Sequence, residues 1–592
     1  MTRIPLRPLA RILAARQTGE NPDKIERAIL AARHEAGRDG QRERVEGRLL
    51  ALALVFLAAF ATVGAKMAVL ATSEPAEPKA AASSTQIVAA RADITDRNGR
   101  ILATNLSTHS VYAQPQHLIN PDIAARKLAQ IFPDLDEQRL YQRFTGPRKF
   151  LWIRRRISPE QRDAVQNIGE PGLLFGPREM RLYPNGRLAA HVLGGVSFGR
   201  EGVSAAELVG VAGVEKAMDD ELRDPGRGDV PLTLSLDLTV QAAVEHVLEG
   251  GMRVMNAKGA VAVLMDARNG EILSLVSLPD FDPNDRPSHF AAGKPSESPV
   301  FNRAVQGVYE LGSTFKVFAA AQGLDEQLVD RDTLIDTKGP LKWGRYSISD
   351  FRDYGPNLSV ENVVVKSSNV GTARIAIMIG AERQREFLGR LGLLASVPLE
   401  LVEVQAARPL VPRIWSGIHT ITVSYGHGIS VSPVHLAAAY ASILNGGVKV
   451  VPTLVKGAGA TGERVVSAET SMQMREILRQ VVTRGTARQA EVPGYHVAGK
   501  TGTADKPKPG GGYHDDKVIA TFASVFPADD PRYVLVVALD EPIETSGREP
   551  RRTAGWTAVP VAAEIIRRAA PILGLAPDIE SRGRQSVMSA QF

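Results

Sequence analysis

Two side chains near the middle of the chain have the spacing of a nucleophile and its base. The segment GSTFK covers residues 312–316, so Ser313 and Lys316 lie three positions apart. At the start of a helix, this spacing places both side chains on one face, a turn apart. A serine hydroxyl needs a nearby base to take its proton. Lysine can be that base only when neutral, which requires burial or a neighbouring cation to lower its pKa.

The Ser-x-x-Lys spacing alone is also typical of a serine that caps a helix and a lysine on its surface. Two later segments supply the groups that such a site would need. The segment SSN (367–369) falls between two helical stretches, where Ser367 could relay protons and Asn369 could orient a lysine or hold a peptide amide. In KTGT (500–503), Lys500 is a second cation that would lower the pKa of Lys316.

The remaining residues of KTGT have the character of a substrate-binding strand. Gly502 lacks a side chain, so a substrate backbone could lie against the strand edge there. Thr501 and Thr503 offer hydroxyl groups to a substrate carboxylate. The three segments together predict a serine acyl-transfer site with Ser313, Lys316, Ser367, Asn369 and Lys500 as catalytic residues.

Composition excludes several other kinds of protein. The chain has 592 residues, 44% of them hydrophobic, which indicates a globular protein of several domains. It contains no cysteine, so disulfides, thiolate nucleophiles and cysteine-ligated zinc sites are excluded. The net charge is +6, but no basic stripe interleaved with aromatic residues indicates a nucleic-acid surface.

One segment near the N-terminus is long and apolar enough to cross a membrane. Residues 49–70 read LLALALVFLAAFATVGAKMAVL, and 22 helical residues cover the hydrocarbon thickness of roughly 30 Å. An arginine-rich tail (1–48) precedes this span, and the flank that follows it is mildly acidic. The positive-inside rule therefore places the tail in the cytoplasm and everything after residue 70 outside.

The rest of the chain divides into segments that differ in composition and in hydrophobic pattern. Residues 71–227 are mixed α/β and begin with a linker and a hairpin around an Asn-Gly turn. Residues 228–575 have strands at both ends that enclose a helical block, which predicts an α+β domain with one sheet built from both ends. Residues 576–592 form a polar, flexible tail.

The three catalytic segments, in this order, are the signature of penicillin-binding proteins and class A β-lactamases. The chain resembles class B penicillin-binding proteins, the membrane-anchored D,D-transpeptidases that cross-link peptidoglycan, over about residues 91–560. Beyond the catalytic segments, the resemblance is carried by RADITDRNG (91–99), RLYPNGRLAAHVLG (181–194) and GVAGVEKAMDDEL (210–222). It departs from the usual pattern at Ala92, where glycine is common, and at Leu311, where proline is common. SSNVG (367–371) and SYGHGISVSP (424–433) are closer to the septal branch, the FtsI family.

The resemblance implies a pedestal or dimerisation-type domain and a transpeptidase domain of the β-lactamase-like fold, an antiparallel sheet with a helical subdomain. It implies that Ser313 attacks a D-Ala-D-Ala stem peptide with Lys316 as base, without a cofactor or metal, and that β-lactams acylate the same serine. The backbone N–H groups of Ser313 and Thr503 would form the oxyanion hole. A polytopic SEDS-type glycosyltransferase and division-site proteins are the implied partners, at the division site of the bacterial inner membrane.

Three other interpretations use the same fold. An elongation-type class B enzyme would act along the cell wall rather than at the septum. A β-lactamase or carboxypeptidase would need a group that activates water, and no glutamate motif of that kind is evident. A non-catalytic β-lactam sensor would be expected to have several spans and a cytoplasmic effector, whereas this chain has one predicted span after 48 residues.

Overall fold

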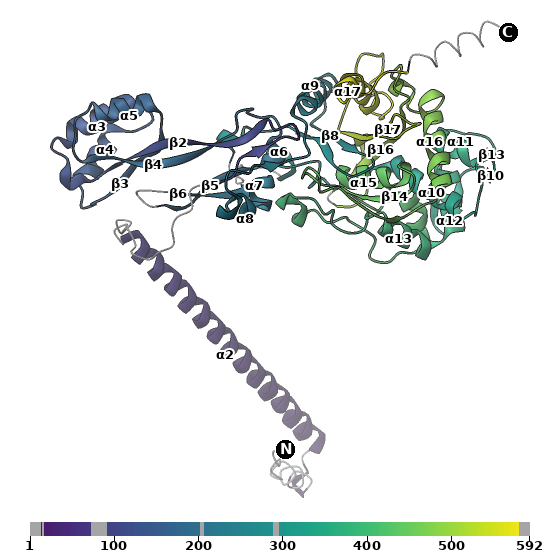
Figure 1. Cartoon of the computed structure of the whole chain (residues 1–592). Helices are drawn as coiled ribbons and strands as arrows, with labels where there is room; N and C mark the ends of the chain where they lie inside the picture. Colours follow the sequence, from purple (N-terminus) through teal and green to yellow (C-terminus); the bar gives the residue numbers. More distant parts are fainter. Residues whose placement is uncertain are drawn as a thin grey trace. The chain divides into compact units, whose positions relative to one another are not determined.

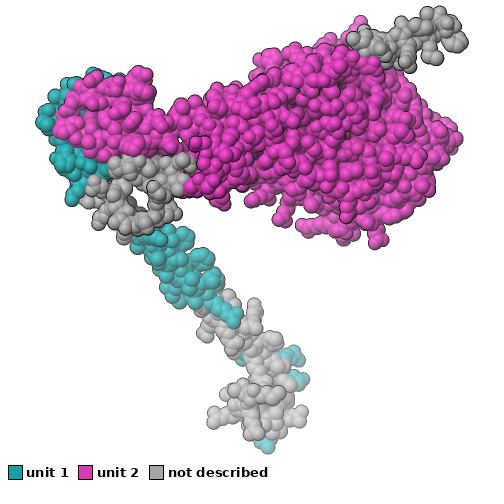
Figure 2. Space-filling model, in the orientation of Figure 1, with its two compact units in different colours: residues 1–79, 113–151 teal, residues 80–112, 152–592 magenta. Residues whose placement is uncertain are grey.

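The computed structural model of the chain describes residues 14, 17–19, 21–72, 91–201, 206–287, 295–508 and 510–578 (Figure 1). These residues fall into two compact units, which Figure 2 shows in different colours. One unit comprises residues 1–79 and 113–151, and the other comprises residues 80–112 and 152–592. The predicted C-terminal tail lies, from residue 579 on, outside the described residues.

The predicted span is part of a longer helix. Helix α2 (Pro22–Thr72) is continuous, so it begins well inside the predicted tail. Its segment Arg48–Lys66 has a mean hydropathy of 2.2, and its apolar side chains are exposed. A helix that is apolar on every face and buried against nothing has the composition expected for a membrane span.

The pedestal is a strongly bent sheet with short helices. The hairpin predicted at 91–103 is confirmed as β1 (Ile94–Thr95) and β2 (Ile101–Ala113), which pair antiparallel. The sheet has the order β3-β2-β1-β7, and β4 also pairs with β2. The remaining strands of the pedestal and its boundary are β3 (Leu151–Ile157), β4 (Leu173–Leu182), β5 (Gly195–Glu201), β6 (Ala206–Ala212) and β7 (Leu232–Thr233). Its helices are α3 (Pro121–Ile131), α4 (Glu137–Phe144), α5 (Pro159–Gln166), α6 (Ala190–Leu193), α7 (Gly213–Ala217) and α8 (Asp219–Leu222).

A buried ion network joins three separate segments of the pedestal. Glu215 on α7 is fully buried and accepts hydrogen bonds from Nε of Arg91 at 2.6 Å and Nε of Arg181 at 2.7 Å. The Tyr183 hydroxyl donates to the same carboxylate at 3.2 Å, and Arg91 also donates to Asp219 at 2.7 Å. These residues come from the three segments that carry the family resemblance outside the catalytic domain. Buried charges are tolerated here because each one is paired and hydrogen-bonded.

The catalytic domain is built on one antiparallel sheet with the order β16-β17-β18-β8-β9. Strands β8 (Gly259–Asp266) and β9 (Ile272–Leu278) come from its beginning, and β16 (Ala498–Pro507), β17 (Tyr513–Phe526) and β18 (Tyr533–Asp540) from its end. The predicted sheet assembled from both ends is therefore confirmed. The central strands are buried along their length because α9 and α17 cover one face and α15 the other (Figure 1).

The helical block lies between the two groups of strands in sequence. Helix α16 contacts both strand β16 and helices α10 and α11, so the block packs against one edge of the sheet. The helices of the domain are α9 (Leu238–Val254), α10 (Lys316–Asp325), α11 (Val360–Lys366), α12 (Asn369–Ile379), α13 (Ala381–Arg390), α14 (Gly417–Ser424), α15 (Pro433–Leu444), α16 (Ala468–Thr483) and α17 (Ala558–Ile572). Three two-stranded antiparallel sheets complete it, formed by β10 (Leu334–Asp336) with β13 (Asn357–Ser359), β11 (Leu341–Trp343) with β12 (Tyr346–Ile348), and β14 (Val448–Val451) with β15 (Ala460–Arg464).

Glu215→Gln should destabilise the pedestal strongly, because it leaves buried Arg181 without its carboxylate and Arg91 with only that of Asp219. Removing one partner of a buried pair costs about 3–5 kcal/mol in the free energy of unfolding. Denaturant unfolding of the full chain in detergent measures this loss. The matched control is Glu221→Gln, which breaks the partly exposed pair with Arg227 and should cost at most about 1 kcal/mol. Equal losses in the two variants would contradict a structural role for the buried network.

Candidate active site

The candidate nucleophile lies on a tight turn rather than inside a helix. Ser313 belongs to the 3₁₀ turn Gly312–Phe315, and the α-helix begins only at Lys316. The prediction that the helix starts at Ser313 is therefore wrong by one turn. Gly312 has a positive φ of 54°, and a Cβ there would lie 2.8 Å from the carbonyl oxygen of Thr503. Glycine is required at this position because the turn passes directly against strand β16.

Lys316 is buried at the first position of α10 and points toward the second motif. Its Nζ donates to the carbonyl oxygen of Ser367 at 2.6 Å and to the Ser367 hydroxyl at 3.0 Å. Burial lowers the pKa of Lys316 well below its usual value, and the charge of Lys500 lowers it further. Both causes are among those predicted from the sequence. Both effects favour the neutral amine, the form that can accept a proton.

Lys500 approaches the same hydroxyl from the sheet. Its Nζ donates to Oγ of Ser367 at 2.9 Å and to the carbonyl oxygen of Thr501 at 3.1 Å. Its side chain is fully buried, and this burial lowers the pKa of Lys500 to about 7. The Ser367 hydroxyl therefore accepts hydrogen bonds from two amines. At neutral pH, a smaller fraction of each amine is protonated than in a free lysine.

Ser367 occupies an unusual backbone conformation at the end of α11. Its φ and ψ are 63° and 46°, in the left-handed region that non-glycine residues rarely adopt. The two following residues begin α12, so the turn Ser367–Asn369 connects two helices as predicted. Such a conformation persists only where neighbouring contacts hold it, and it is typical of functional sites.

Asp350 holds this turn and was not identified from the sequence. One of its carboxylate oxygens accepts the Ser368 hydroxyl at 2.7 Å, and the other accepts the backbone N–H groups of Asn369 and Val370. The carbonyl oxygen of Ser349 accepts the side-chain amide of Asn369 at 3.0 Å. No spacing rule singles out Asp350, because it lies 17 residues before Ser367 on a short segment after β12.

The KTGT residues lie on β16, in register with β17. A Cβ at Gly502 would lie 2.2 Å from the carbonyl oxygen of Leu311, so glycine allows the strand to contact the nucleophile turn. This is a further reason for glycine besides the predicted approach of a substrate. The Thr503 hydroxyl accepts the backbone N–H of Ala554 at 3.0 Å, and the Thr501 hydroxyl bonds the Thr486 hydroxyl at 2.7 Å.

Glu310, three residues before Ser313, was also not identified from the sequence. Its carboxylate connects this segment to two others. Glu310 accepts the backbone N–H of Gly428 at 2.8 Å and the Tyr513 hydroxyl at 3.1 Å. Gly426, in the same SYGHG segment, has a positive φ, and a Cβ there would lie 2.1 Å from the carbonyl oxygen of Gly312. The turn that carries Ser313 is thus fixed from three sides.

Taken together, these contacts bring the predicted residues from three distant segments into one region. A partly exposed serine lies on a fixed turn, a buried lysine with a lowered pKa follows it by three residues, and a second lysine shares the Ser367 hydroxyl with the first. This arrangement can deprotonate an alcohol and return the proton to a leaving group. In the part of the chain that the structure describes, no three histidine or carboxylate side chains gather in a way that could hold a metal ion.

Family models match most of the chain. The penicillin-binding protein transpeptidase domain matches residues 260–567, and the penicillin-binding protein dimerisation domain matches residues 86–227. The first range contains every predicted site residue, and the second contains the buried network around Glu215.

Among curated proteins, the chain is 36% identical over 498 residues to a probable peptidoglycan D,D-transpeptidase FtsI of Caulobacter vibrioides, covering 82% of each chain. It is 32% identical to the stage V sporulation protein D of Bacillus subtilis, covering 82% of this chain and 79% of the relative. It is 28% identical to the peptidoglycan D,D-transpeptidase FtsI of Escherichia coli, covering 77% of this chain and 80% of that protein.

A solved structure agrees with these matches. Penicillin-binding protein 3 of Mycobacterium tuberculosis, in complex with aztreonam, is 27% identical with a TM-score of 0.62. The similarity covers 83% of this chain and 97% of that one. With both domain models matched in order behind a candidate membrane helix, the chain belongs to the class B penicillin-binding proteins and is of the FtsI type.

Proposed function

We propose that this protein is a serine-type peptidoglycan D,D-transpeptidase that cross-links stem peptides at the division septum. The observation that carries the proposal is the Ser367 hydroxyl shared by two buried lysines, Lys316 at 3.0 Å and Lys500 at 2.9 Å. The relatives named as FtsI-type transpeptidases support the reaction and the septal role. β-Lactams are the expected inhibitors, since the similar mycobacterial structure contains one.

In the first half of the reaction, Ser313 Oγ attacks the carbonyl carbon of the penultimate D-Ala of a stem peptide. The proton of the hydroxyl passes to the neutral amine of Lys316. The backbone N–H groups of Ser313 and Thr503 stabilise the negative charge on the tetrahedral oxygen. The carbon–nitrogen bond then breaks, and Ser367, with the two lysines, delivers a proton to the departing D-Ala amine. An ester on Ser313 remains.

In the second half, an amine from a neighbouring stem peptide attacks this ester. The amine loses a proton to Lys316, the ester bond breaks, and the Ser313 hydroxyl takes a proton back. A new amide links the two peptides. We assign Asn369 and the strand Lys500–Thr503 to holding the peptide, with Thr501 and Thr503 available to its carboxylate and Gly502 at the strand edge. The hydroxyls of Thr501 and Thr503 would exchange their present protein partners for substrate oxygens.

We also propose the division of the chain and its orientation. The cytoplasmic tail is residues 1–48, the span 49–70, the periplasmic pedestal 71–227, the transpeptidase domain 228–575 and the C-terminal tail 576–592. The matched family ranges fall inside the pedestal and transpeptidase ranges, and the arginines before the span support a cytoplasmic N-terminus. By resemblance to the septal branch, the partners are a SEDS-type glycosyltransferase and division-site proteins.

Two alternatives remain useful as contrasts. An elongation-type enzyme would share the chemistry, but the relatives include two named FtsI and a sporulation protein. A non-catalytic β-lactam sensor would be expected to have several membrane spans, whereas the described residues contain one candidate span.

Ser313→Ala should abolish covalent labelling by a fluorescent penicillin, because the other hydroxyl of this turn, that of Thr314, is buried and donates to the carbonyl oxygen of Leu311. Labelling of the purified full chain is read on a denaturing gel, where only a covalent ester survives. The wild type should be labelled once per chain. The thermal unfolding midpoint should be unchanged, which separates loss of the nucleophile from loss of the fold. Retained labelling in the variant would exclude Ser313 as the nucleophile.

Lys500→Gln should shift the acid limb of the pH–acylation profile to higher pH. Acylation requires neutral Lys316, so its rate falls as the pH drops through the pKa of that amine. Removing the charge of Lys500 removes one of the causes that lower this pKa, so protonation sets in at higher pH. The second-order rate constant for labelled penicillin, measured between about pH 5 and pH 9, tests this. An unmoved limb would show that the two lysines are not electrostatically coupled.

Asp350→Asn should shift the same limb in the opposite direction and slow acylation. The negative charge of Asp350 raises the pKa of Lys316, so its loss moves the limb to lower pH. The variant also replaces an acceptor of three donors, which should cost about 1–3 kcal/mol in the free energy of unfolding. Asp353→Asn, exposed on the same segment, is the matched control and should shift nothing. A rate loss without a pH shift would reduce Asp350 to a purely structural role.

A further inference from the structure

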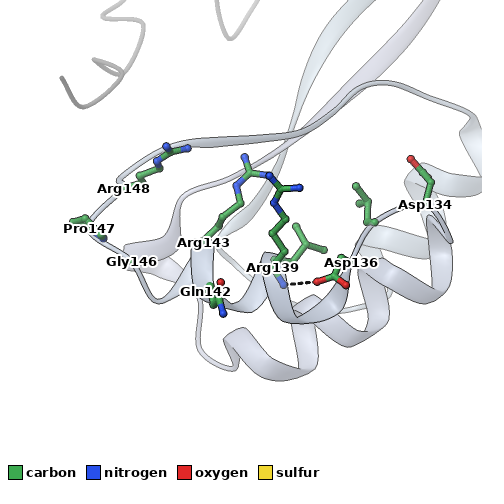
Figure 3. A pocket seen from close by; sticks show the side chains of 10 residues that line it. Asp134, Asp136, Arg139, Gln142, Arg143, Gly146, Pro147 and Arg148 are labelled. Carbon is green, nitrogen blue, oxygen red and sulfur yellow. Dashed lines mark hydrogen bonds between the residues drawn. The ribbon is translucent and has the colours of Figure 1, made fainter. Parts of the chain in front are cut away.

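A cleft in the head of the pedestal collects three arginines that serve no catalytic purpose. Helix α4 and the loop after it line a cavity of about 600 Å³. Figure 3 shows Arg139 and Arg143 extending from the same side of α4 with their ends close together, and Arg148 approaching from the loop. Leu135 and Leu140 provide apolar lining. The whole cleft belongs to one compact unit of the chain, apart from the catalytic domain.

None of the three guanidinium groups is neutralised. Among the described residues, no carboxylate or side-chain acceptor bonds Arg139, Arg143 or Arg148. Two carboxylates, those of Asp134 and Asp136, line the same cavity. Asp136 caps α4 by accepting the backbone N–H of Arg139 at 2.6 Å, and Glu137 lies 3.5 Å from Arg126. Two buried arginines of the pedestal, Arg91 and Arg181, are in contrast held by Glu215 or Asp219.

The positive charges of these arginines repel one another. Like charges four residues apart on a helix repel each other, and Arg139 and Arg143 have this spacing. Half-burial, together with the charges of Arg148 and Arg139, lowers the pKa of the Arg143 guanidinium. A single cation near the C-terminal end of α4 is favourable to the helix dipole, but that does not account for the convergence of three.

The three guanidinium groups indicate which kind of ligand would suit this cleft. Guanidinium groups bind phosphate and carboxylate oxygens through paired hydrogen bonds, most strongly where water is partly excluded. Three arginines around one small cavity suit a compact group with several negative oxygens. An extended acidic peptide presents its charges at intervals of about 3.3 Å per residue, which would suit a basic stripe better than one cleft.

We propose that this cleft is a binding site for a phosphate or diphosphate group. The chain has a candidate membrane span. The phosphate can therefore come from a phospholipid headgroup in the bilayer or from a diphosphate ester that is not part of the bilayer. The chemistry required of the three arginines is the same for both. The site is independent of the transpeptidase reaction, because none of the arginines lies in the catalytic domain.

The test measures binding of inorganic pyrophosphate to the full-length chain in nanodiscs of neutral phosphatidylcholine, by calorimetry at two salt concentrations. The wild type should bind about one pyrophosphate per chain. Arg143→Gln and the pair Arg139→Gln/Arg148→Gln should each weaken binding about tenfold or more, the loss typical of a charge-assisted contact. Lys149→Gln, exposed beside Arg148 but outside the cleft, is the matched control and should change affinity less than about twofold.

No saturable binding by the wild type, or equal losses in the cleft variants and the Lys149 control, would overturn the proposal. Tighter binding of an oligo-glutamate peptide than of pyrophosphate would overturn it in favour of an acidic protein partner. Nanodiscs containing phosphatidylglycerol distinguish the sources, because a headgroup in the cleft would weaken pyrophosphate binding to the wild type but not to Arg143→Gln. Unchanged binding in those discs assigns the site to a phosphate group from outside the bilayer. Labelling of Ser313 by penicillin should be equal in all variants, so failure here is separable from failure of the enzyme assignment.

Discussion

Two buried amines that share one hydroxyl impose the central constraint on this protein. Lys316 and Lys500 both donate to Ser367, and in the described part of the chain neither has a carboxylate partner. Two unpaired ammonium charges so close together in a buried site would be very costly. At least one amine must therefore be neutral at physiological pH, and a neutral lysine is what a serine nucleophile needs. The reactivity follows from the desolvation that folding imposes.

The rest of the catalytic domain keeps this site closed and its parts in register. Gly312 and Gly502 allow the nucleophile turn and strand β16 to approach to backbone contact, which a Cβ at either position would prevent. Asp350 fixes the left-handed turn at Ser367 from the opposite side. A small displacement would solvate the amines, restore their ordinary pKa values and remove the base.

Basic residues occur in three different electrostatic environments in this chain. Around Glu215, buried arginines are fully paired, which joins the three pedestal segments into one rigid unit. Around Ser367, two buried lysines have no carboxylate partner among the described residues, and burial lowers their pKa values instead. In the cleft on α4, Arg139 and Arg148 are exposed and Arg143 is half-buried, so they keep their charge, and we propose that they bind an anion. Burial and pairing together decide whether a basic residue is structural, catalytic or ligand-binding.

The sequence by itself determined the apolar helix that is a candidate membrane span, the hairpin at 91–103, the sheet drawn from both ends of the C-terminal domain and the three motifs proposed to be catalytic. These features depend on local periodicity, turn residues and fixed short spacings, which a single chain displays directly. Only the tertiary structure decided that Ser313 lies on a 3₁₀ turn, that Asp350 and Glu310 hold the site, and that three arginines converge in the head. Those facts depend on contacts between segments far apart in sequence, and no local pattern encodes which distant backbone group a carboxylate will meet.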